Sequence, residues 1–202
     1  LPLLRDVLDR AFAATTAEYV IYTNVDIALM PHFYAAVHDY IRRGFDAFTV
    51  NRRTLSDGPR TVADIPLLYG ETGRPHPGYD CFVFRREAYP SYVLGDVCLG
   101  TGHVDLPLIC SMIAGSRRFI DLTDAHLTFH IGDRRTWWSW KYRDYLRHND
   151  TEACRALLEQ ARRAGLLGRL RPHARVMLAL GVPKNSLLVS EWKRLFRAES
   201  VL

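Results

Sequence analysis

Long apolar runs are absent from the sequence, and none approaches the roughly 20 residues that a membrane-spanning helix needs. The first ten residues do not have the pattern of a secretory signal peptide, because Asp6 and Asp9 interrupt them. Cysteine is scarce, with four residues in 202 and no CxxC pair, which argues against a zinc ribbon or a disulfide framework. This cysteine usage is typical of a reducing compartment, so we expect a cytoplasmic protein.

The composition excludes a disordered or low-complexity chain. Hydrophobic residues make up 48% of the sequence and charged residues 24%, so the chain can bury a sizeable core. The formal net charge of +5 is unevenly distributed. Residues 1–133 contain 12 Lys and Arg against 16 Asp and Glu, whereas residues 134–202 contain 15 against 6. We therefore expect a core over residues 1–133 and a basic extension over residues 134–202.

The spacing of apolar residues predicts an α/β order of elements. The expected helices are 3–12, 31–43 and 106–114, and the expected strands are 18–22, 46–50, 81–84, 119–122 and 127–130. Residues 51–78 are rich in Gly, Pro, Asp and Arg and are predicted to form one long loop. From residue 134 the pattern is helical, with breaks at 165–168 and 181–183. The predicted fold is a mixed sheet with flanking helices and a helical C-terminal extension.

An amide and a carboxylate, Asn24 and Asp26, directly follow the first expected strand. In open α/β sheets, ligands bind at the carboxyl ends of strands. A carboxylate beside an amide suits a hard divalent cation that also holds substrate phosphates. The alternative is an Asx turn ahead of the helix that begins at Pro31.

Two histidines, His126 and His130, are four residues apart on an expected strand, so both are predicted to face the same side. A neutral imidazole at the end of a strand can complete the coordination of a cation such as Mn²⁺. We therefore expect Asp26 and His130 to share one cation, Mn²⁺ or Mg²⁺. The alternative for each histidine is a hydrogen-bonded structural role.

The predicted loop carries further candidates. Arg52 and Arg53 can neutralise a diphosphate, and Tyr79 and Asp80 can contact a sugar acceptor by stacking and by accepting hydroxyl hydrogen bonds. A solvated loop with Pro-Gly turns is the alternative interpretation of these residues.

Four short motifs follow one another along the core. They are Tyr22-Thr23-Asn24-Val25-Asp26, Phe84-Arg85-Arg86-Glu87-Ala88, Gly100-Thr101-Gly102-His103-Val104-Asp105-Leu106 and Leu127-Thr128-Phe129-His130. In this order they resemble the GT-A-fold glycosyltransferases, especially the family-2 type, over about residues 15–133. The resemblance implies a Rossmann-like mixed sheet, a nucleotide-sugar donor, a saccharide or lipid-linked hydroxyl acceptor, and a metal at the D-x-D-type motif, where Asn24 and Asp26 stand.

The chain departs from the family pattern at three places. Asn24 replaces the first acid of D-x-D, which lowers the charge of the site. The resemblance implies a base that deprotonates the acceptor, for which Asp105 is favoured and His103 is second, while a helix N-cap is the structural alternative for Asp105. Only 23 residues precede Asn24, where the family has a nucleotide-binding βαβ region. We expect either the C-terminal portion of a longer protein or a chain without the donor-base pocket.

The start of the basic extension, residues 134–143, interleaves cations with aromatic residues. Packing onto the core is the favoured interpretation, followed by contact with a membrane surface and then, least favoured, nucleic-acid binding. The leading hypothesis is a metal-dependent glycosyltransferase of the hexosyltransferase type, cytoplasmic or peripheral at the inner face of a membrane. The alternative is a non-catalytic GT-A-like remnant that binds membranes or nucleic acid through its basic tail.

Overall fold

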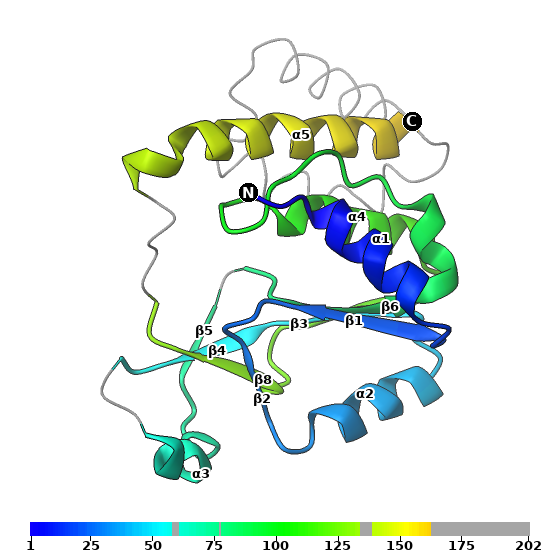
Figure 1. The fold of residues 1–202 in the computed structure, drawn as a ribbon. Helices are drawn as coiled ribbons and strands as arrows, with labels where there is room; N and C mark the ends of the chain where they lie inside the picture. The colour runs from blue at the N-terminus through cyan, green and yellow to red at the C-terminus, as the bar shows by residue number, and fades with distance from the viewer. Residues whose placement is uncertain (58–60, 77, 134–138, 163–202) are drawn as a thin grey trace, which may run out of the picture. The chain divides into compact units, whose positions relative to one another are not determined.

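The computed structural model of the chain describes residues 1–57, 61–76, 78–133 and 139–162. Two compact units are present, drawn in Figure 1. Residues 18–86 and 116–135 form what we call the strand unit, and residues 1–17, 87–115 and 136–202 form the helical unit. The structure confirms the predicted α/β class, with mixed sheets and flanking helices.

The strand unit holds two four-stranded mixed sheets, in the orders β1-β6-β3-β7 and β2-β8-β4-β5. The strands are Tyr19–Thr23 (β1), Ala28–Leu29 (β2), Ala47–Val50 (β3), Arg52–Leu55 (β4), Arg74–Pro75 (β5), Cys81–Arg85 (β6), Phe119–Leu122 (β7) and Thr128–Ile131 (β8). The helices are Phe33–Arg42 (α2) and Ile65–Leu68 (α3), with a 3₁₀ turn at Val62–Asp64. Strands β3 and β7 are parallel, as are β4 and β8, and the other pairs are antiparallel.

Helix α2 covers one face of the first sheet. Its buried Phe33 and Val37 pack with Phe48 of β3, Val83 of β6 and Leu122 of β7. The period of two on the strands and of about 3.6 on the helix brings these apolar residues to one interface. This core fixes the ends of β1, β3 and β6, where the polar residues described below lie.

The predicted loop over residues 51–78 is wrong. It contains β4, α3 and β5, and only Asn51 separates β4 from β3. The hydropathy pattern did not indicate strand β4, because the strand begins with the two charged residues Arg52 and Arg53. Side chains of β4 are nevertheless buried in the strand unit: Arg52 is buried against carboxylates, and Leu55 packs with Met30 and Phe129.

The helical unit contains Leu4–Ala14 (α1), Asp105–Gly115 (α4) and Arg143–Arg162 (α5), with 3₁₀ turns at Arg86–Ser91 and Trp140–Tyr142. Helices α4 and α5 pack against each other. Their fully buried side chains include Leu108, Ile109, Met112 and Leu157. Helix α5 realises the first part of the predicted helical extension, while residues 134–138 and 163–202, with the expected breaks at 165–168 and 181–183, lie outside the described residues. Within the described part of the chain, no helix has both the length and the apolar character needed to cross a bilayer.

The expectation that His126 and His130 lie on one strand is wrong. His126 precedes β8 and has a φ of 46°, so the alternation of a strand does not extend to it. Its Nε2 is buried and has no hydrogen-bond partner among the described residues. Burial lowers the pKa of His126, and the nearby Arg53 and His32 lower it further.

Lowering the pH from 7 to 5 is expected to destabilise the protein through His126. The unfolded chain takes up a proton near the usual histidine pKa of about 6.5, whereas the lowered pKa of His126 means that the folded chain takes it up only at a lower pH. The free energy of unfolding is therefore at its full value above this pH and falls as the pH decreases below it. His126→Asn, which suits a positive φ, should flatten this dependence in urea denaturation. An equally steep dependence in the variant would contradict the assignment to His126.

Candidate functional site

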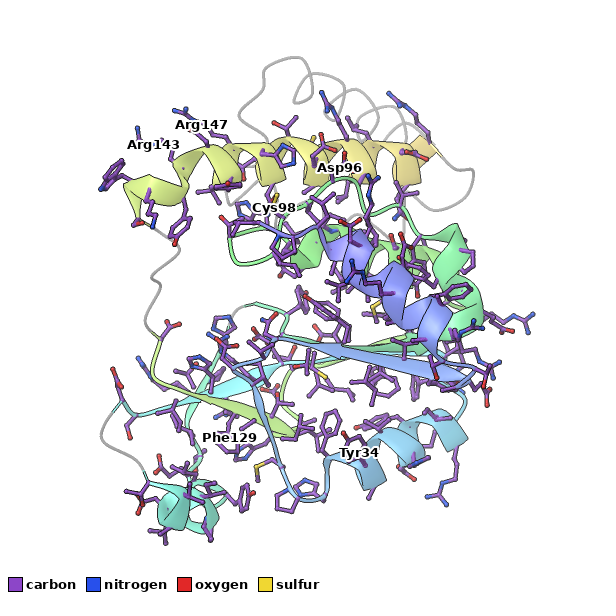
Figure 2. All side chains as sticks on the ribbon, viewed as in Figure 1. Tyr34, Asp96, Cys98, Phe129, Arg143 and Arg147 are labelled. Carbon is purple, nitrogen blue, oxygen red and sulfur yellow. The ribbon has the colours of Figure 1, made fainter. Side chains whose placement is uncertain are left out.

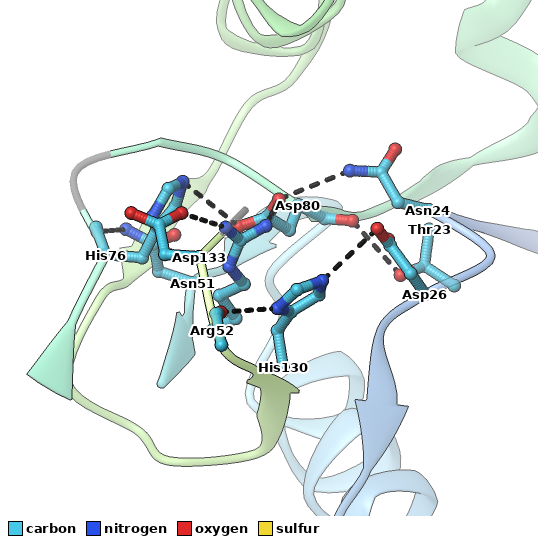
Figure 3. Close-up of polar contacts among 10 residues, drawn as sticks. Thr23, Asn24, Asp26, Asn51, Arg52, His76, Asp80, His130 and Asp133 are labelled. Atoms are coloured by element: carbon cyan, nitrogen blue, oxygen red, sulfur yellow. Dashed lines mark hydrogen bonds and ion pairs between the residues drawn. The ribbon is translucent and has the colours of Figure 1, made fainter. Parts of the chain in front are cut away.

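Polar side chains from four segments of the strand unit meet at one edge of the first sheet (Figure 3). Thr23 and Val50, the last residues of β1 and β3, both pair with Cys81, the first residue of β6. The carboxyl ends of strands are the usual ligand-binding edge of α/β sheets. The residues that gather there, which we call the polar cluster, are Asn24, Asp26, Asn51, Arg52, His76, Asp80, His130 and Asp133.

Asp26 and His130 are in contact, as Figure 3 shows, although 104 positions separate them in the sequence. His130 Nε2 lies 3.3 Å from Asp26 Oδ2, and His130 Nδ1 lies 2.7 Å from the carbonyl oxygen of Gly132. Because a carbonyl only accepts hydrogen bonds, Nδ1 carries the proton and donates it. In the neutral ring, the lone pair of Nε2 then faces the carboxylate. Two acceptors at this distance attract each other only when a cation or a second proton lies between them.

This pair fits two ligands of one divalent cation. Metal–oxygen distances of about 2.1 Å place neighbouring ligands of an octahedral ion about 3 Å apart, close to the 3.3 Å between Nε2 and Oδ2. The Gly132 carbonyl orients the ring as outer partners of metal-bound histidines do. No group of three or more His, Cys, Asp or Glu in the described residues is arranged to hold a metal. A cation here would take its remaining ligands from water and phosphate oxygens, as Mg²⁺ commonly does.

Arg52 is buried and bridges two carboxylates. Its NH1 lies 2.9 Å from Asp80 Oδ1 and its NH2 lies 3.3 Å from Asp133 Oδ1. Both terminal nitrogens are therefore engaged by the protein itself. The structure thus gives Arg52 a different role from the predicted one at a diphosphate: it ties the start of β6 to the turn that follows β8.

Asn24 belongs to the Asp80 side of the polar cluster. Its Nδ2 donates a hydrogen bond to Asp80 Oδ1 over 3.2 Å, and its Oδ1 is directed away from Asp26 (Figure 3). An aspartate at position 24 would set a second carboxylate against Asp80, whereas the amide donates to it. The amide at position 24 therefore suits the carboxylate that it faces.

Of the residues predicted to bind the acceptor or the diphosphate, Tyr79, Asp80 and Arg53 have the following contacts and burial. Asp80 is 4% exposed and is engaged by Asn24 and Arg52, while the adjacent Tyr79 is half-buried. Arg53 alternates with Arg52 along β4, and its guanidinium donates to the carbonyls of Thr72 and Gly73 over 2.9 and 3.0 Å. The structure does not bring Arg53 to the polar cluster.

The charges of the polar cluster favour a cation. Three carboxylates, those of Asp26, Asp80 and Asp133, surround a single guanidinium. With neutral imidazoles the cluster carries two net negative charges. One of these charges lies at Asp26, where it faces His130, and the other is left on Asp80 and Asp133, which share the single positive charge of Arg52.

The two predicted base candidates lie in the helical unit. Asp105 is the first residue of α4, and His103 stands two residues before it with a φ of 63°. His103 Nδ1 lies 2.5 Å from Oδ1 of Asp150 on α5. Asp150 was missed in the sequence because it falls in the segment predicted as an extension.

Two members of the polar cluster, His76 and Asp133, were also missed as functional residues. His76 Nε2 lies 3.8 Å from Asp80 Oδ2, and Asp133 pairs with Arg52. The signals for them were present but weak: His76 lies between prolines in the predicted loop, and Asp133 ends the turn that follows the last strand.

The sequence matches no protein-family model and none of the curated proteins. Among solved structures, that of S. aureus TarS residues 1–349 in complex with UDP-GlcNAc is similar to this chain, with a TM-score of 0.45 and 12% sequence identity. The match covers 92% of this chain and 58% of that one, so the chain spans less than two thirds of its length. At this level the similarity bears on neither family nor activity.

Asn24→Asp is expected to destabilise the protein by about 1–3 kcal/mol, because it removes a donor to Asp80 and adds a like charge beside it. Asn24→Ala, which removes only the donor, should cost less. Urea denaturation at neutral pH measures both values. Equal stability of wild type and Asn24→Asp would contradict the role given to the amide.

Arg52→Met is expected to cost about 3–5 kcal/mol of unfolding free energy, because it leaves the buried carboxylate of Asp80 without its cation. Arg53→Met is the matched control on the same strand, since the guanidinium of Arg53 donates to the carbonyls of Thr72 and Gly73, and its loss should be less than half as large. Thermal and urea denaturation test the difference. Similar losses in the two variants would contradict the bridging role of Arg52.

Proposed function

We propose that the chain is a metal-dependent glycosyltransferase of the hexosyltransferase type, which transfers a sugar from a nucleoside-diphosphate donor to a hydroxyl of a saccharide or a lipid-linked acceptor. The observation that carries the proposal is the contact between Asp26 and His130. Such a pair, with one carboxylate and one carbonyl-oriented imidazole, suits a cation that shares its coordination with a diphosphate.

Asp26, in the turn after β1, and His130, in strand β8, would hold Mn²⁺ or Mg²⁺. A cation bound there would supply positive charge to the diphosphate leaving group. Arg52 pairs with Asp80 and Asp133 rather than with Asp26, so the carboxylate of Asp26 keeps its charge for the cation. Asp105 or His103 accepts the proton of the attacking hydroxyl. Direct attack by that hydroxyl inverts the anomeric carbon.

The first test measures Mn²⁺ binding by the electron paramagnetic resonance of the free ion, together with release of nucleoside diphosphate from a panel of UDP-, GDP- and dTDP-sugars. Wild type should bind Mn²⁺ and release the diphosphate, and EDTA should abolish the release. Asp26→Ala and His130→Gln should each weaken Mn²⁺ binding by on the order of 100-fold, because each removes one of two protein ligands.

His38→Gln is the matched control, since His38 is exposed on α2 away from the polar cluster. It should leave both readouts unchanged. Undiminished diphosphate release in EDTA, or equal Mn²⁺ affinity in wild type and Asp26→Ala, would contradict the proposed metal site. Salt-dependent binding to anionic vesicles or RNA without any diphosphate release would instead favour a binding module that acts through the basic extension.

A further inference from the structure

Helix α5 is held in the helical unit from residue 148 onward, and the chain before that point is exposed. Asn149 is completely buried, and its side chain makes three hydrogen bonds to the backbone of Cys98 and Gly102. His148 Nε2 donates to the carbonyl of Asp96 over 2.7 Å. No residue from 139 to 147, a stretch that includes the 3₁₀ turn and the start of α5, is buried. We call residues 139–147 the basic–aromatic segment.

The basic–aromatic segment exposes the largest apolar side chain that a protein can carry. Trp140 is 86% exposed, and Tyr145, at the first turn of α5, is 40% exposed. The expectation that the indoles of this segment pack onto the core is therefore wrong for Trp140, while Trp137 and Trp138 lie outside the described residues. Tryptophan is highly buried on average in water-soluble folds, so an indole in solvent indicates a surface that another apolar medium covers.

Positive charge surrounds this indole. The basic–aromatic segment contains Lys141, Arg143 and Arg147 against the single acid Asp144. Arg143 and Arg147 are four residues apart on α5 and share one face of it, and Figure 2 shows both at the start of the helix. Trp140 stands one 3₁₀ turn before Arg143, which brings it to the same side. The exposed pair of Arg147 with Asp144, at 3.6 Å, is too weak to withdraw that arginine from an external anion.

We infer that the basic–aromatic segment docks the protein onto the surface of an anionic phospholipid membrane. Indole and phenol rings favour the headgroup region, where the ring leaves water and its polar atom stays hydrated, and long basic side chains reach the lipid phosphates from there. A nucleic acid fits less well, because its affinity grows with the number of phosphates neutralised and this segment has a small excess of cations. The inference lies within the helical unit and concerns binding, so it does not depend on the proposed function.

The test measures binding of the full chain to sedimented vesicles of phosphatidylcholine alone and of phosphatidylcholine with phosphatidylglycerol at a ratio of about 2:1. Wild type should bind the anionic vesicles more tightly, and added salt should weaken this binding. Trp140→Ala should lower the affinity by on the order of tenfold, because the indole no longer removes its apolar surface from water. Arg143→Gln should lower it about fivefold, the effect of one basic residue near an anionic surface.

Each variant has a matched control elsewhere on the chain. Tyr34→Ala removes another exposed aromatic ring, 62% exposed on α2, from the strand unit. Arg155→Gln removes the same charge from α5 two turns after Arg147, where the arginine pairs with Glu152 over 2.6 Å. Both controls should bind vesicles like wild type. Because all four substituted side chains are exposed, their thermal denaturation should match that of wild type, so a loss of binding is not a loss of the fold.

A second measurement reports the position of the indole itself. Vesicles that contain brominated phosphatidylcholine should quench the tryptophan fluorescence of wild type, and the quenching should be smaller in Trp140→Phe. No binding to anionic vesicles, or equal affinity of wild type and Trp140→Ala, overturns the inference. It is also overturned if Trp140→Ala weakens binding to single-stranded RNA and not to vesicles, or if it only abolishes a dimer seen by light scattering. Vesicle binding that depends on Trp140 supports the inference even if no donor releases its diphosphate.

Discussion

The buried guanidinium of Arg52 is the constraint on which the polar cluster depends. It links β4 to the start of β6 through Asp80 and to the turn after β8 through Asp133. Asp80 in turn accepts from Asn24, and Asp133 follows Gly132, whose carbonyl orients His130. The turn that carries Asp26 and the strand that carries His130 are therefore both connected to one side chain. Burial of such charges adds little net stability, so the benefit of the bridge lies in fixing geometry.

The sheet topology explains why this constraint is needed. Strand β3 passes into β4 after a single residue, and β7 is followed by β8 after five residues, so the chain leaves one sheet and enters the other at two adjacent places. The strands change their pairing partners at these junctions. Side chains must then hold the segments together, and Asn51 and Arg52 do so at the β3–β4 junction, with Asn51 Nδ2 donating to the carbonyl of His76 over 2.7 Å.

Elements with local signals could be predicted from the sequence, and elements defined by distant partners could not. The apolar strands β1, β3, β6 and β7 and the helices α1, α2 and α4 lie within a few residues of their predicted bounds. Strand β4 was missed because two arginines resemble a solvated loop until the acids that neutralise Arg52 are known, and these lie 28 and 81 positions away. The turn at His126 was missed because a positive φ at a residue other than glycine leaves no pattern in the sequence.

The candidate site shows the same division. Asp26 and His130 could be singled out because each stands at the end of a strand, where ligands collect. Asp150 could not, because its importance comes from the partner it meets 47 positions away. The composition of this segment indicates only a solvent-exposed, basic helix. From the sequence, one buried acid in such a helix cannot be distinguished from its exposed neighbours.

The two histidines differ in the partner that holds Nδ1, and this difference separates their chemistry. His130 donates to a neutral carbonyl, which fixes the ring and leaves Nε2 as a ligand atom beside a carboxylate. His103 donates to a carboxylate, which stabilises a ring that has taken up a proton. A carboxylate behind the ring makes Nε2 more basic than a carbonyl does, so Nε2 of His103 holds a proton more strongly than Nε2 of His130 would with the Gly132 carbonyl alone. The oxygen that accepts from Nδ1 is therefore the feature that sets the two imidazoles apart.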